Sequence, residues 1–97
     1  MGGKRFSLSA EIDTDNPAAV EPVLRRLISS GTVELGGSPG EFVVRAEMVG
    51  ESPKALNRSL LSELRRAERR TRLRAEWTFA DGTTERYFDY VLKKTFR

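Results

Sequence analysis

The sequence predicts an α+β domain, a two-layer sandwich in which an antiparallel sheet is covered on one face by two helices. Three observations lead to this prediction: several segments alternate apolar and polar residues, two others repeat apolar residues at helical spacing, and one Asp-Gly pair marks a tight hairpin. The 97 residues suit a single domain, 1–97, in which residues 1–4 and 94–97 are expected to fray.

The first half of the chain is predicted to contain three strands and one helix. Asn16 and Pro17 are typical of a helix N-cap and first helical position. Apolar side chains then recur on one helical face between Val20 and Ile28, and Gly31 is expected to end this helix. The predicted elements are a strand at 6–12, a helix beginning at 17, a strand at 33–35, a turn at 36–40 and a strand at 41–49.

The second half is predicted to contain one helix and a β-hairpin. Ser52 and Pro53 open the helix, and its buried face carries Leu56, Leu60, Leu64 and Ala67. A strand at 72–79 and a return strand at 83–92 flank Asp81-Gly82. If that pair forms the whole loop, Leu73 lies opposite Tyr90 and Trp77 opposite Arg86. In that register Phe88 and Tyr90 face the core and Tyr87 faces away from the helices.

The predicted element order is β-α-β-β-α-β plus an extra C-terminal β-strand. The first six elements match the ferredoxin-like split βαβ pattern, which places both helices on one face of the sheet. The extra strand is expected at the edge, beside the fourth.

Three runs carry a resemblance to a known family: 11–13, 21–27 and 83–90. They resemble segments of a family of small uncharacterised bacterial proteins of about 100 residues with a ferredoxin-like pattern. The resemblance covers most of the chain and implies no activity, cofactor or site residue.

Composition removes several kinds of chemistry. The chain has no cysteine and no histidine, which excludes disulfides, thiolate metal sites and the commonest general base. Asp13 and Asp15 do not begin a calcium loop, because Pro17 and Ala18 stand where a third ligand and a glycine are required. We therefore predict no metal, no cofactor and no catalytic residues. Because neither a signal peptide nor a membrane span is recognisable, a cytoplasmic protein is expected.

The net charge of +3 arises from one arginine-rich segment. Residues 58–74 contain seven arginines and two glutamates, a local charge of +5. Arginine is a strong ligand for phosphate, so this helix is a candidate for sequence-tolerant nucleic-acid binding. A merely solvated basic face is the alternative. The candidate anion-binding residues are Arg58, Arg65, Arg66, Arg69 and Arg70.

The second candidate surface is the sheet face that no helix covers. Its apolar residues are expected to be Val43, Val49, Tyr87 and Val91. We therefore rank a protein-interaction or self-association module first, with a protein partner or a second copy as ligand. Nucleic-acid binding ranks second, and a small-ligand regulatory domain ranks third.

Overall fold

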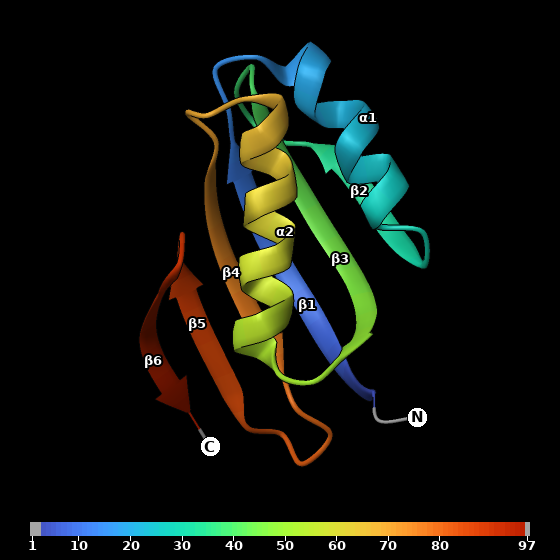
Figure 1. Ribbon diagram of the computed structural model, residues 1–97, viewed down its shortest axis with the longest axis vertical. Coiled ribbons are helices and arrows are strands. Elements are labelled where there is room, and N and C mark those ends of the chain that lie inside the picture. The colour runs from blue at the N-terminus through green and yellow to red at the C-terminus, as the bar shows by residue number, and fades with distance from the viewer. Residues whose placement is uncertain (1–2, 97) are drawn as a thin grey trace.

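The computed structural model describes the backbone of residues 3–96 and the side chains through residue 93. The elements in this part of the chain are β1 (Lys4–Asp13), α1 (Pro17–Leu27), β2 (Gly31–Leu35), β3 (Glu41–Gly50), α2 (Pro53–Ala67), β4 (Arg72–Thr78), β5 (Thr84–Phe88) and β6 (Val91–Phe96). All strands join one antiparallel sheet in the order β2-β3-β1-β4-β5-β6. Both helices cover the same face of this sheet, so the predicted α+β arrangement is confirmed (Figure 1).

The helices begin where the capping residues predict. The side chain of Asn16 accepts a hydrogen bond from the N–H of Ala19, and Ser52 accepts one from Ala55. Gly31 does not end α1; it starts β2, where a Cβ atom would collide with the backbone of β3. Within the described residues, neither helix is long and apolar enough to cross a membrane.

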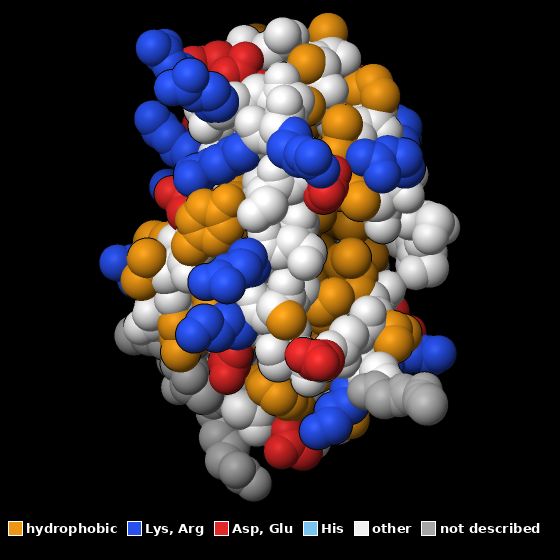
Figure 2. Space-filling view, viewed as in Figure 1, with side chains coloured by type: hydrophobic (Ala, Val, Ile, Leu, Met, Phe, Trp, Pro, Cys, Tyr) orange, Lys and Arg blue, Asp and Glu red, His pale blue; other side chains and the backbone are white. Residues whose placement is uncertain are grey.

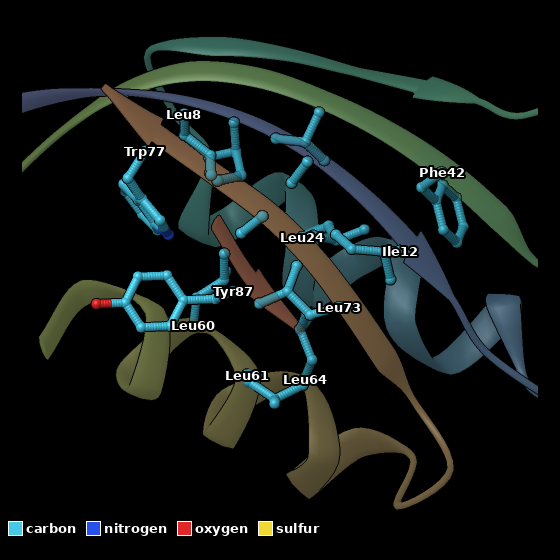
Figure 3. Packing of buried hydrophobic residues seen from close by; sticks show 14 of the residues in the cluster. Leu8, Ile12, Leu24, Phe42, Leu60, Leu61, Leu64, Leu73, Trp77 and Tyr87 are labelled. Carbon is cyan, nitrogen blue, oxygen red and sulfur yellow. The ribbon is translucent and has the colours of Figure 1, made fainter. Parts of the chain in front are cut away.

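The core lies between the two helices and the sheet (Figure 3). Alternate residues of β1, from Phe6 to Ile12, are buried as predicted, and so are Leu73, Ala75 and Trp77 of β4. Leu60 and Leu64 anchor α2 against this layer, while Leu56 is only partly buried. The strand periodicity therefore identified the inward face correctly for β1 and β4.

The predicted register of the hairpin around Asp81-Gly82, formed by β4 and β5, is wrong by one residue. The N–H of Phe79 donates to the carbonyl of Thr83 at 2.7 Å, so the loop contains three residues, 80–82, instead of two. Gly82 takes the left-handed conformation, with φ of 91°, as three-residue hairpin loops require. Ala75 consequently pairs with Tyr87. A shift of one residue exchanges the faces of a strand, so Tyr87 is buried while Phe88 is exposed.

The return strand predicted at 83–92 is two strands in the structure. β5 ends at Phe88, and the chain turns back through Asp89 and Tyr90 into β6. Asp89 has a positive φ of 56°, which aspartate tolerates better than most residues. The sheet therefore has six strands where five were expected. Of the residues expected to fray, Lys4 begins β1 and residues 94–96 belong to β6, whereas residues 1–2 and 97 lie outside the described part of the chain.

A buried asparagine on α2 connects the helix, β4 and this second turn. The indole N–H of Trp77 donates to the side-chain oxygen of Asn57 at 3.1 Å. The amide nitrogen of Asn57 donates in turn to the carbonyl of Asp89 at 2.7 Å. Asp89 also exchanges two hydrogen bonds with the backbone of Leu73, one through its N–H and one through its carboxylate. This network fixes the turn between β5 and β6 against the core.

We predict that Asn57→Leu destabilises the protein by about 2–5 kcal/mol. The substitution leaves the buried indole N–H of Trp77 and the carbonyl of Asp89 without their partner. Urea unfolding followed by the fluorescence of the single tryptophan measures the loss. Ser59→Ala, at an exposed position of the same helix, is the control and should change stability by less than about 0.5 kcal/mol. An equally small effect of Asn57→Leu would contradict the network.

Candidate functional site

The exposed apolar side chains concentrate on one hairpin. Among the described residues, the exposed large hydrophobics are Leu35, Val49, Phe88, Tyr90, Val91 and Leu92. The last four form what we name the terminal hairpin patch, with 42–55% of each residue exposed. Phe88 and Val91 are cross-strand neighbours on the open face of the sheet, whereas Leu92 pairs with Tyr87 on the helix side. The patch therefore covers both faces of the hairpin.

The patch lies where the helix layer ends. α2 covers the middle of the sheet, and β5 and β6 lie beside it (Figure 1). β6 is the last strand in the sheet order, so no described strand pairs with its outer edge. An uncovered edge strand presents a row of backbone N–H and C=O groups that can pair with another chain.

Arg65 anchors the hairpin and is not free to bind a ligand. Its Nε donates to the carbonyl of Thr71 at 2.9 Å, and its Nη2 lies 3.4 Å from the carboxylate of Asp89. The guanidinium also lies over the ring of Tyr90, 5.3 Å from the centroid. The hydroxyl of Tyr90 lies 3.1 Å from that of Ser62. Ser62 and Arg65 of α2 thus contact the β5–β6 hairpin from the helix side of the sheet.

The other candidate arginines divide into paired and unpaired groups. Arg66 forms an ion pair with Glu63 at 3.3 Å, and Arg70 forms one with Asp15 at 3.7 Å. Both guanidinium groups are well exposed, so these pairs are weak. Arg58 and Arg69 are exposed and form no ion pair with a described residue. Of the five arginines predicted to bind anions, Arg58 and Arg69 therefore form no ion pair with another described residue.

Positive charge nevertheless surrounds the terminal hairpin patch. Lys54, Arg58 and Arg65 lie at i, i+4 and i+11 on α2, which places them on one helical stripe. Since Arg65 contacts Asp89 and Tyr90, this stripe, which we name the basic flank, faces the hairpin. Figure 2 shows basic side chains along this side of α2. On the other side, Arg74 and Lys93 lie 5.7 Å and 5.8 Å from the ring centroid of Phe88.

The residues predicted for the open sheet face do not form one surface. Val43 is half-buried and Val49 is exposed, both on β3, whereas Val91 lies on β6 with three strands between them. Polar side chains occupy the intervening face, including the ion pair of Arg86 with Glu76 at 2.8 Å. The prediction for the fourth candidate, Tyr87, is wrong. The register shift places Tyr87 on the opposite face of the sheet, where it is buried.

Tyr87 belongs to the core, as Figure 3 shows for its ring between the sheet and α2. Its hydroxyl donates to the carboxylate of Glu85 at 2.8 Å. Burial, and to a smaller degree the hydrogen bond and negative charge of Glu85, raise the pKa of Tyr87 far above its ordinary value. Tyr87 is protonated at neutral pH, as an ordinary tyrosine is, and its hydroxyl serves as a hydrogen-bond donor to Glu85.

A small hollow lies on the open face of the sheet, over β1, β3 and β4 beside the turn at Gly36 and Gly37. Its volume is about 250 Å³, and its charged lining residues are Glu11, Asp13, Glu41, Arg72 and Arg74. Three of these side chains are acidic and two are basic, and no group of residues suited to holding a metal ion is present in the described part of the chain. The hollow is smaller and more polar than most small-molecule sites.

Comparisons with known proteins identify no family and no relative for this chain. No protein-family model matches the sequence, and neither a curated protein nor a solved structure has significant similarity to it. The resemblance to small bacterial proteins therefore stays a prediction.

We predict that Arg65→Gln destabilises the protein by about 1–3 kcal/mol, because the hydrogen bond to Thr71 and the ion pair with Asp89 are both partly buried. Arg66→Gln is a matched control one position further along α2. Its exposed ion pair should contribute less than about 1 kcal/mol. Thermal unfolding of both variants measures the difference. Equal losses would mean that Arg65 is as dispensable to the fold as a surface arginine.

Proposed function

We propose that the chain is a non-catalytic protein-interaction module and that the terminal hairpin patch is its binding surface. One observation carries the proposal: among the described residues, four of the six large exposed hydrophobic side chains lie on a single hairpin, at a sheet edge with which no described strand pairs. Contiguous exposed apolar patches of this kind are typical of interaction sites in soluble proteins.

The construction of the hairpin supports this proposal. Asn57 and Arg65 hold the turn at Asp89, so a ligand would meet a surface that is already ordered. Binding to a preorganised surface loses less conformational entropy than binding to a flexible one. Aromatic side chains, here Phe88 and Tyr90, are also enriched at the centres of protein interfaces.

Nucleic-acid binding through the arginine helix stays the second candidate. Stacking of bases needs free aromatic faces, but cations of the protein already lie against the rings of Phe88 and Tyr90. The exposed aliphatic side chains of Val91 and Leu92 have no part in phosphate recognition. A small-ligand regulatory role is third, because the hollow described above is small and polar for a ligand site.

A finer description of the fold belongs with this proposal. We propose a ferredoxin-like sandwich formed by β1–β4 and the two helices, which β5 and β6 extend at one edge. The order β2-β3-β1-β4 supports it, because β3 lies between the two strands that α1 connects. The cytoplasmic setting expected from the sequence stays a prediction.

A selection of random peptides of about twelve residues on the immobilised protein tests the function. We predict that recovered peptides bind Leu92→Ser at least about tenfold more weakly, since a buried leucine contributes about 1.5–3 kcal/mol. Leu35→Ser is the matched control: Leu35 is exposed on β2, at the opposite edge of the sheet. It should leave the affinity unchanged, and circular dichroism should show both variants folded. If no peptide distinguishes the two variants, the terminal hairpin patch is not the binding surface.

A further inference from the structure

We infer that the partner of the terminal hairpin patch is an extended, acidic segment of another protein that adds to the sheet as a strand beside β6. The inference rests on the proposed function and specifies its ligand. It has three grounds: the free edge of β6, the apolar residues on both faces of that edge, and the positive charge around it.

The edge of β6 offers main-chain hydrogen bonds to a partner. β6 spans six residues, Val91–Phe96, and pairs only with β5 among the described strands. Added strands gain affinity from such backbone bonds and specificity from alternate side chains. β2 is the other edge strand, but it is one residue shorter and Leu35 is its only large exposed hydrophobic residue.

The apolar residues of the hairpin suit an added strand. Val91 shares the open face with Phe88, while Leu92 shares the helix face with Tyr87. A neighbouring strand places successive side chains on alternate faces, so it can contact both exposed groups at once. An isolated patch on one face would not require an extended ligand.

The charges around β6 favour carboxylates in the partner. Lys93 of β6 lies against the ring of Phe88, and the basic flank lies on the helix side of the hairpin. Of the acids on the hairpin, Asp89 forms an ion pair with Arg65, and Glu85 accepts a hydrogen bond from Tyr87 but keeps its negative charge. The basic residues nearby outnumber these two acids even without Arg65: Lys54, Arg58, Arg74 and Lys93. The hairpin therefore presents uncompensated positive charge to a ligand.

The same charges disfavour a second copy as the ligand. Antiparallel pairing of two β6 strands along their full length would set Lys93 of one copy against Lys94 of the other. Like charges directly opposite each other destabilise a strand pair, and lysines on edge strands are a common protection against self-pairing. An acidic strand from a different protein meets no such penalty.

The test uses synthetic versions of the selected peptides, with binding measured by fluorescence anisotropy. We expect these peptides to alternate apolar residues with aspartate or glutamate. N-methylation of every second residue should reduce affinity by more than about tenfold in one phase, where the N–H groups face β6. In the other phase it should change affinity little. Lys93→Glu should weaken binding about tenfold or more, while Lys4→Glu, an exposed lysine of β1, should not.

The outcomes separate this inference from the function beneath it. Peptides that depend on Leu92 but lack acidic residues, or that tolerate N-methylation in both phases, would overturn the acidic strand and leave the interaction surface in place. Loss of any dependence on Leu92 would overturn both. Tighter binding of single-stranded oligothymidylate than of any peptide, lost in Leu92→Ser, would replace the protein partner by a nucleic acid. A dimer in light scattering that Leu92→Ser dissociates would replace it by a second copy.

Discussion

Asn57 is the one polar residue among the buried residues of α2. The hydrogen bonds of its carboxamide connect α2 to β4 and to the turn between β5 and β6, and the arrangement of these C-terminal elements depends on them. The carboxamide oxygen accepts from the indole of Trp77 in β4, and the carboxamide nitrogen donates to the turn at Asp89. A buried amide with both ends satisfied is stable, while one with a missing partner is costly. The chain therefore folds back after Phe88 at a place where Asp89 can reach both Asn57 and the backbone of Leu73.

This anchoring explains how the protein keeps apolar side chains exposed on an ordered edge. β5 and β6 lie beside the helix layer, so no helix buries Phe88, Val91 or Leu92. β5 is held by its pairing with β4 and by the burial of Tyr87, and Asn57 and Arg65 additionally fix the turn that leads into β6. Arg65, Arg74 and Lys93 lie 5–6 Å from the rings of Phe88 and Tyr90. A charged side chain on an edge strand, such as Lys93, disfavours unwanted pairing with other chains.

The sequence was sufficient for the α+β class, the helix caps and the inward faces of β1 and β4, because periodicity and capping act within a few residues. The predicted register of the β4–β5 hairpin was wrong because Asp81-Gly82 also fits a three-residue loop with glycine in the left-handed conformation. That one residue moved Tyr87 into the core and Phe88 out of it. Arg65 and Arg58 have the same charge and lie on the same side of α2, so only the long-range contact with Asp89 separates their roles.

Native-state hydrogen exchange measured by NMR tests most directly whether the terminal hairpin is a fixed part of the fold. The amide of Leu73 donates to the carboxylate of Asp89, and the amide of Asp89 donates to the carbonyl of Leu73. If the network around Asn57 holds, both amides exchange as slowly as that of Ala10 in the central strand, through global unfolding. Exchange as fast as that of Gly37, in the exposed 36–40 turn, would show that the hairpin opens independently and would contradict this account.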